Sequence, residues 1–274
     1  MNKAILLATV GLFFSLGVVA QKLPSIQKES IRTPQGIKID GKSIEWKNNF
    51  QAYNGNTNIF YTLSNDDTNL YLVVQSRNAG INSKILIGGL TLTINTSGDK
   101  KDKNGVSVMF PFLNEKAKRT AIGRAMAGLK SWERETNPEV KKRQMDSVSY
   151  AMNRTQIDKL KEIRVIGIKE IQDTVISIYN EQDILARALF EDQNTYTYEL
   201  ALPLKYLNLS AKSAKTFVYN ITLNGVLSGF GDRGPGIIAA GSEGGRPAIV
   251  GPGGMDVRVL ALPTDFWGKY TLAK

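Results

Sequence analysis

The residues that most often carry chemistry in proteins are sparse in this chain of 274 residues. It contains no histidine and no cysteine. Neither a Ser-His nor a Cys-His nucleophile can therefore be assembled, and the commonest protein ligand of zinc and haem is missing. The composition predicts a protein that binds a partner rather than an enzyme.

The lack of histidine and cysteine does not exclude glycoside hydrolysis, because this reaction needs only two carboxylic acids roughly 5–9 Å apart. Glu199, within the segment TYTYELAL, is the most suggestive single acid. No partner is evident for it, and a lone glutamate on a strand usually faces solvent. We therefore expect Glu199 to be exposed and hydrolysis to be the weaker alternative.

A second candidate for chemistry is the acidic turn SNDDTN, which holds Asn65, Asp66 and Asp67. Such oxygen-bearing side chains could ligate calcium. Asn and Asp also dominate turns for backbone reasons alone, and the spacing is not that of an EF-hand loop. Calcium is the one cofactor that the sequence leaves open.

The elements that would position these groups are mostly strands, since apolar and polar residues alternate in many short segments. In TYTYELAL, Tyr196 and Tyr198 share one face while Thr197 and Glu199 share the other, and Pro203 should end the strand. The other expected strands are Ile59–Leu63, Leu70–Gln75, Leu90–Asn95, Val106–Phe112, Arg164–Ile168, Thr174–Ile178, Phe217–Leu223 and Asp265–Leu272, with Asp183–Phe190 a strand or a short helix.

This pattern predicts a fold dominated by β-structure, an antiparallel β-sandwich that forms a single domain over 37–274 behind a polar lead-in, 21–36. Helical spacing interrupts it over 114–163, where Pro138 opens the second of two helix-like stretches. Over 114–164, Lys and Arg number 13 against 7 Asp and Glu, a net charge of +6. This helical insertion is either a docking surface for an anionic partner or a solvated face, and the interspersed charges favour the solvated face.

The segment 228–254 contains ten glycines and three prolines. Loops of this length inside a compact domain are usually functional or disordered. The strand–loop–helix context of a phosphate-binding loop is absent, so nucleotide binding is not expected. We interpret this Gly-rich loop as a flexible lid or a partner-binding loop at one end of the sandwich.

The N-terminus has the features of an export signal: a positive Asn2-Lys3, an apolar Ala4–Leu16 and small residues up to Ala20. We expect cleavage after residue 20 and a periplasmic or extracellular protein with no membrane span. The mature charge would be 34 minus 25, or +9. For an exported protein this basic balance favours glycans or anionic lipids over nucleic acid.

Several phrases resemble the family 9 carbohydrate-binding modules and their DOMON-like relatives, jelly-roll-type sandwiches found in bacterial envelopes. They are IKIDGKSIEW (37–46), NIFYTLSNDDTNLYLVVQSRN (58–78), GGLTLTINTSGDKKDKNGVSVMFP (88–111), YELALPLKYL (198–207) and DFWGKYTL (265–272). The resemblance implies that Trp46 and Trp267 belong to the core. Thr93 stands where an aromatic residue is usual, and the lack of histidine argues against the haem site of DOMON relatives.

The resemblance implies a non-catalytic protein that binds a glycan or oligosaccharide through the loop end of the sandwich. Such a site needs a flat exposed ring beside polar groups. The candidates are Tyr53, Arg77, Asn224, Arg233 and Arg246. The alternative is an envelope protein-interaction or structural role that uses the basic insertion and the Gly-rich loop.

Overall fold

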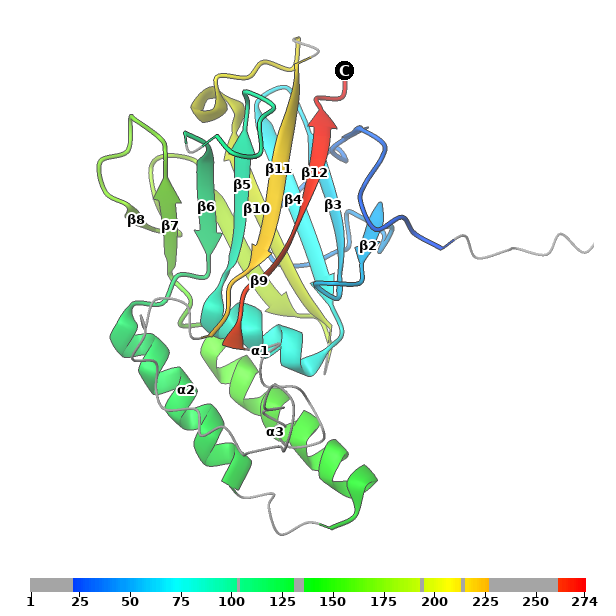
Figure 1. Ribbon diagram of the computed structural model, residues 1–274, viewed down its shortest axis with the longest axis vertical. Coiled ribbons are helices and arrows are strands. Elements are labelled where there is room, and N and C mark those ends of the chain that lie inside the picture. The colour runs from blue at the N-terminus through cyan, green and yellow to red at the C-terminus, as the bar shows by residue number, and fades with distance from the viewer. Residues whose placement is uncertain (1–21, 103, 131–135, 193–194, 213–214, 227–260) are drawn as a thin grey trace, which may run out of the picture.

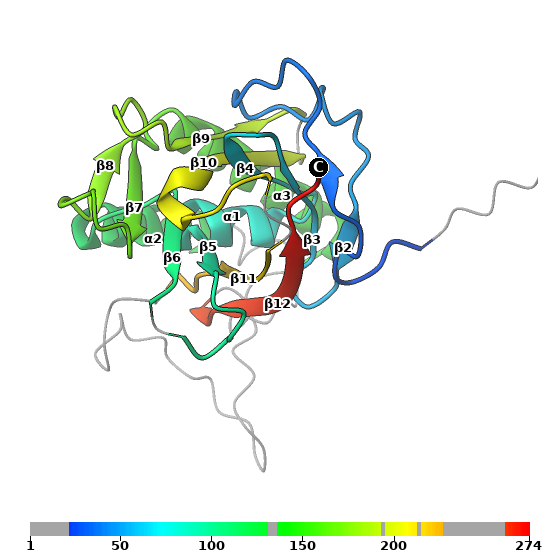
Figure 2. The same cartoon turned by 90° about the horizontal axis from the view of Figure 1, so that it is seen from above.

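Two β-sheets face each other to form a β-sandwich (Figures 1 and 2). The computed structural model describes residues 22–102, 104–130, 136–192, 195–212, 215–226 and 261–274. Arg233, Arg246 and the rest of the Gly-rich loop 228–254 lie outside the described residues, as does the expected signal 1–20. Seen from above, the two sheets form separate layers with helix α1 (Ala79–Gly88) beneath them (Figure 2).

The first sheet, sheet A, has the strand order β1-β3-β4-β10-β9, and β2 also pairs with β3. It is mixed rather than purely antiparallel, because β1 runs parallel to β3 while every other pair in it is antiparallel. Its strands are β1 (Ile31–Arg32), β2 (Ala52–Asn54), β3 (Ile59–Asn65), β4 (Asn69–Ser76), β9 (Leu185–Phe190) and β10 (Tyr196–Pro203).

The second sheet, sheet B, is antiparallel throughout, with the strand order β12-β11-β5-β6-β7-β8. In Figure 1 it is the layer nearer the viewer. Its strands are β5 (Leu90–Asn95), β6 (Val106–Phe110), β7 (Glu162–Ile166), β8 (Val175–Ser177), β11 (Thr216–Leu223) and β12 (Thr264–Thr271).

The inward-facing apolar residues of these alternating strands fill the core between the sheets. In β10, Tyr196, Tyr198, Leu200 and Leu202 all face inward and are fully buried, as expected. The strand ends at Pro203, where the short 3-10 helix η1 (Leu204–Leu207) begins. The segment Asp183–Phe190, for which the sequence allowed a strand or a short helix, contains strand β9.

The helical insertion is confirmed by two helices, α2 (Glu115–Lys130) and α3 (Pro138–Ile157), which extend away from the sandwich (Figure 1). Pro138 is the first residue of α3, and the side chain of Asn137 caps it by accepting from Glu139 N. The insertion ends slightly earlier than expected, because β7 already begins at Glu162.

Helix α1 was not predicted, and it closes one end of the sandwich. Asn78 caps it by accepting from Ile81 N, and a hydrogen bond of 3.2 Å from Asn153 Nδ2 to Ser83 Oγ joins it to α3. Nearly all of its side chains are buried, including Lys84. Such a helix lacks the one-sided apolar stripe by which amphipathic helices are recognised.

The lead-in 21–36 is part of the fold from residue 22 onward. Gln27 is buried and exchanges hydrogen bonds with the backbone of Leu63, while its own N–H donates to Tyr61 Oη. Next to it, β1 pairs with the end of β3. The segment thus extends sheet A beyond the start expected at Ile37.

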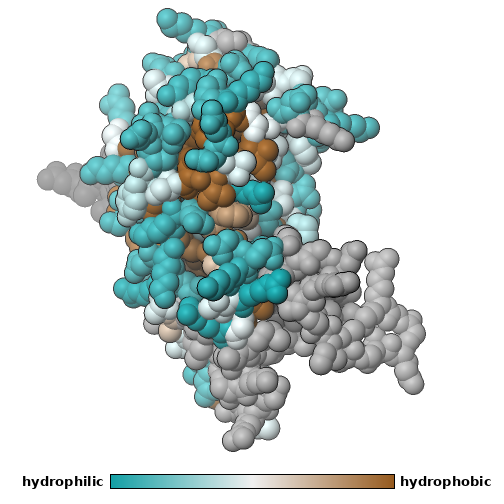
Figure 3. All heavy atoms as spheres, turned by 90° about the vertical axis from the view of Figure 1, so that its left-hand side faces the viewer, coloured by the Kyte–Doolittle hydropathy of each residue, from teal (hydrophilic) through white to brown (hydrophobic). Residues whose placement is uncertain are grey.

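The two sheets stay open along the side that carries β7 and β8, because β8 and β9 are the last strands of their sheets. Figure 3 views the molecule from this side and shows an apolar stripe between hydrophilic side chains. Two large apolar residues on this side, Ile166 of β7 and Leu185 of β9, are exposed because they point away from the core on the outer faces of their sheets.

Candidate carbohydrate-binding face

The outer face of sheet A is covered. Residues 37–50 cross it and bring Trp46 and Phe50 against Tyr71, Val73 and Ala201, which form a second small core. Trp46 is 5% exposed, so its predicted burial is confirmed. In Figure 2 this N-terminal chain, drawn in blue, runs along the outside of β3 and β4. This face has no room for a ligand where the cover lies.

Glu199 fastens the cover to the sheet. Its Oε2 accepts hydrogen bonds from Asp40 N (3.0 Å) and Gly41 N (2.8 Å), and its Oε1 accepts one from Trp46 Nε1 (3.0 Å). The side chain is 1% exposed, so the expectation of a solvent-facing glutamate was wrong. The alternation did place it on the outer face, but a sequence does not show that another segment covers that face.

The chemistry of this carboxyl is set by two opposing effects. Burial raises the pKa of Glu199 from its ordinary value of 4.5 to about 7, although the hydrogen bonds from Trp46, Gly41 and Asp40 lower it. A raised carboxyl pKa is often a mark of a catalytic acid. Here both oxygens face N–H groups of the cover, so the arrangement serves attachment.

A second carboxylate, that of Glu191, holds the same cover at Ser43. Glu191 Oε1 accepts from Ser43 N (3.0 Å) and Ser43 Oγ (2.8 Å), and it also accepts from the hydroxyl of Thr197. Gln75 Nε2 donates to Ser43 Oγ at 3.4 Å. The phrase IDGKSIEW is thus a fastened cover rather than a strand, since no strand is assigned within 37–46.

The outer face of sheet B is different, because most of its side chains are partly or fully exposed. The strand register aligns Trp267, Asn220, Thr93, Ser107 and Ile166 in one row across five strands. The neighbouring row begins with Asp265, Thr222 and Thr91. We call Thr91, Thr93, Ser107, Asn220, Thr222, Asp265 and Trp267 the polar face.

Trp267 is partly exposed on this face, so its predicted place in the core was wrong. The reason is the register of β12, in which Phe266 and Tyr270 point into the core and their neighbours point outward. Lys100 approaches the ring, with its Nζ 5.9 Å from the ring centroid. One large ring therefore lies at the edge of a row of small polar side chains.

The polar groups of this face already form ordered pairs. Asn220 Nδ2 donates to Asp265 Oδ2 at 2.7 Å and to Phe266 O at 3.0 Å, and Asn220 Oδ1 accepts from the hydroxyl of Thr222. The hydroxyls of Thr93 and Ser107 are 2.8 Å apart. The face offers hydroxyl and carboxylate groups in fixed positions beside an indole, while the Asn220 side chain is only 6% exposed and holds Asp265 in place.

The three predicted binding residues that the structure describes do not meet at one site. Tyr53 and Arg77 lie near each other on sheet A, both against Phe60: the Tyr53 ring centroid is 4.7 Å and the Arg77 Cζ 6.0 Å from the Phe60 ring. Asn224 lies at the end of the polar face, where its Nδ2 donates to Thr91 Oγ1 at 2.8 Å.

The side chains of the acidic turn are used within the fold. Asp66 Oδ1 caps the turn by accepting from Thr68 N and Asn69 N at 2.7 Å each, and Asp67 pairs with Arg32 at 2.9 Å. Asn65 binds the backbone of Ala273. Within the described ranges, no three acidic, histidine or cysteine side chains are grouped as metal ligands would be.

Sequence reasoning missed Trp267 and the row beside it because each member comes from a different strand. The available signal was the alternation in LTLTIN and in the second half of FVYNITL, which places Thr91, Thr93, Asn220 and Thr222 opposite the apolar residues.

Comparison with family models, with curated proteins and with solved structures finds no match to this chain. Among the helices that the structure describes, none has the length and apolarity that crossing a membrane requires.

Proposed function

We propose that this protein is an exported, non-catalytic carbohydrate-binding module of the family 9 and DOMON-like type, and that it holds its glycan on the polar face of sheet B. One observation carries the proposal: the partly exposed Trp267 stands at the end of a row of amide and hydroxyl side chains, Asn220, Thr93 and Ser107.

Sugars present both kinds of surface that this face would match. Their C–H faces stack on aromatic rings, and their hydroxyls exchange hydrogen bonds with a few fixed polar groups. Thr93, which replaces the usual aromatic residue, places a small hydroxyl side chain between Asn220 and Ser107. Trp267 supplies the ring from the edge strand instead.

Calorimetric titration of the protein without its export signal against neutral and acidic oligosaccharides tests the proposal. Saturable binding is expected to weaken at least tenfold in Trp267→Ala, about 1.4 kcal/mol or more, and less in Trp267→Phe, which keeps a ring. Tyr179→Ala is the matched control, because Tyr179 is 70% exposed in the connection between β8 and β9, away from the polar face.

Two results would contradict this assignment. Loss of sugar binding in Tyr179→Ala with retention in Trp267→Ala would move the site to the opposite edge of sheet B, next to β8. A flat response to every oligosaccharide would instead favour the alternative function, an envelope interaction protein. The observation behind that alternative is the pair of helices α2 and α3, which project from the sandwich (Figure 1).

A further inference from the structure

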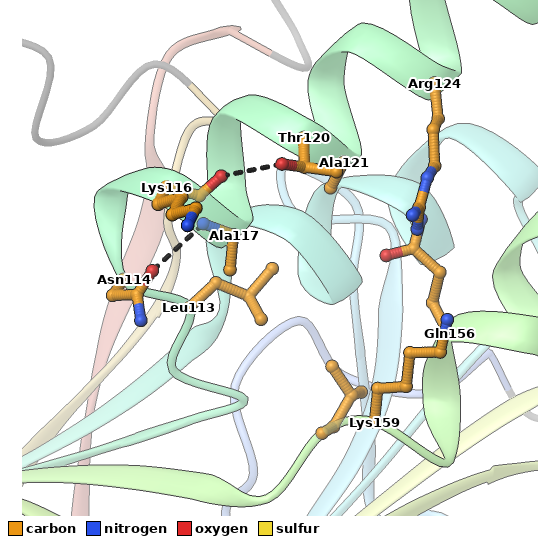
Figure 4. Close-up of a pocket in the computed structure, with 10 residues that line it drawn as sticks. Leu113, Asn114, Lys116, Ala117, Thr120, Ala121, Arg124, Gln156 and Lys159 are labelled. Atoms are coloured by element: carbon orange, nitrogen blue, oxygen red, sulfur yellow. Dashed lines mark hydrogen bonds between the residues drawn. The ribbon is translucent and has the colours of Figure 1, made fainter.

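The base of the helical insertion contains a cleft of about 370 Å³ between α2 and the end of α3. This volume falls in the range of roughly 300–1,000 Å³ that is usual for small-molecule sites. Its walls come from the start of α2 and from the residues around the C-terminal end of α3 (Figure 4). The cleft is separate from the polar face, which lies on sheet B.

The floor of this cleft is apolar. It is formed by Leu113, Ala117, Ala121 and Leu160, of which Ala121 and Leu160 are buried. Small alanine side chains on α2 leave the space that the larger leucines border. An apolar floor of this kind favours a ligand with a hydrocarbon body.

The rim of the cleft is cationic. Lys116, Arg124 and Lys159 line it, no acidic residue does, and all three side chains are exposed. In Figure 4 Arg124 extends from α2 toward Gln156 and Lys159 at the opposite wall. None of the three cations forms a salt bridge with another residue in the part of the chain that the structure describes.

We propose that this cleft binds an amphipathic anion, a ligand with a carboxylate or phosphate head group on a short hydrocarbon body. The head group would be held by Arg124 and Lys159, and the hydrocarbon would cover the floor between Leu113 and Leu160. Arginine and lysine suit such head groups because charge-assisted hydrogen bonds to carboxylate or phosphate are about twice as strong as neutral ones. The source would be a free acid or the head group of an anionic lipid.

Titration with decanoate, with decanol as its neutral counterpart, tests both halves of the proposal. Decanoate is expected to bind saturably and decanol at least tenfold more weakly. The variant Arg124→Gln, Lys159→Gln should weaken decanoate binding at least tenfold. Arg143→Gln should leave it unchanged, since Arg143 is exposed on α3 and does not line the cleft. The melting temperature of each variant shows that the fold is kept.

A third variant, Ala117→Phe, fills the floor without changing the charge and should also abolish binding. Equal binding of decanol and decanoate would overturn the proposal, as would full decanoate binding by the double variant.

Vesicles of phosphatidylglycerol and of phosphatidylcholine separate the two sources. Decanoate binding without vesicle binding indicates a free acid, and binding of both decanoate and anionic vesicles indicates a lipid. Vesicle binding without decanoate binding would overturn the proposal, since a flat membrane needs no cleft.

Discussion

The outer faces of the two sheets arise from the same alternation of inward and outward side chains, but one face is covered by another segment and the other is largely exposed. On sheet A, Val73, Gln75, Thr197 and Glu199 point outward and are buried beneath residues 37–50. On sheet B, Thr91, Thr93, Ser107 and Met109 point outward and stay partly exposed. Polar outward residues thus mark an attachment surface on one sheet and a candidate binding surface on the other.

The two tryptophans express this difference most directly. Trp46 is buried, and its indole N–H donates a hydrogen bond to Glu199. Trp267 instead lies at the edge of the polar face beside Lys100. A tryptophan that is held by a buried acid stabilises the fold, and one that is partly exposed beside polar groups can contact a ligand. The comparison predicts that substitutions on sheet A cost stability and that substitutions on sheet B cost binding.

The largest effect is expected from Glu199→Leu. Removing the carboxyl leaves three N–H donors without their acceptor, two of them buried, so the free energy of unfolding should fall by about 3–5 kcal/mol. Urea unfolding followed by circular dichroism measures this change. Asp265→Asn is the matched control on the other face, and it should cost less than about 1 kcal/mol because Asp265 is exposed. Equal losses in the two variants would break the comparison.

The second effect concerns the backbone that Glu199 holds. Gly41 has φ +86°, and a Cβ there would lie 2.8 Å from the backbone carbon of Ala188. Gly41→Ala should therefore lower the free energy of unfolding by about 2–3 kcal/mol, from left-handed strain plus displacement of the cover. Gly36→Ala isolates the strain, since Gly36 has φ +73° and open space around it. If both variants lose the same amount, the cover is not closely packed on β9.

These positions also show what the sequence could and could not predict. Alternation located most strands and put Glu199 opposite Tyr198, because side-chain direction depends only on local backbone geometry. It did not reveal that 37–50 covers Glu199, because that contact joins residues 158 positions apart, as in the hydrogen bond from Gly41. Ala79–Gly88 was missed as a helix because burial on nearly all sides removes the periodic signal.

The same limit applies to the candidate site. Trp267 is aligned with Asn220 and Thr93 only through the registers of β12 on β11 and of β11 on β5. Two candidates chosen from the sequence, Tyr53 and Arg77, lie together on sheet A instead. The choice rested on residue type, and residue type does not specify which sheet a strand joins.

The third effect separates the two tryptophans. Trp46→Phe removes the indole N–H that bonds Glu199 and leaves a small cavity, so unfolding should become easier by about 2 kcal/mol. Trp267→Phe should change the free energy of unfolding by less than about 0.5 kcal/mol, because its ring is partly exposed. Parallel urea titrations of both variants measure the difference. A larger loss in Trp267→Phe would mean that Trp267 belongs to the structural core after all.

The smallest expected effect is the change in the free energy of unfolding per pH unit that the titration of Glu199 causes. Because burial raises its native pKa to about 7 from 4.5, the native state keeps a proton that the unfolded state releases between these values. The stability contributed by this group is therefore full below pH 4.5 and is lost as the pH rises toward 7, with a slope of at most about 1.4 kcal/mol per pH unit.

Urea unfolding of the wild type and of Glu199→Gln between pH 4 and pH 8, at roughly half-unit steps, measures this slope as the difference between the two proteins. A falling difference means that burial outweighs the three N–H donors and that a neutral acid fastens the cover. A rising difference means the reverse: the donors hold the native pKa below 4.5, and the cover is fastened by an ion. In that second case the covered face would hold a buried negative charge at neutral pH, stabilised by the N–H groups of Asp40, Gly41 and Trp46.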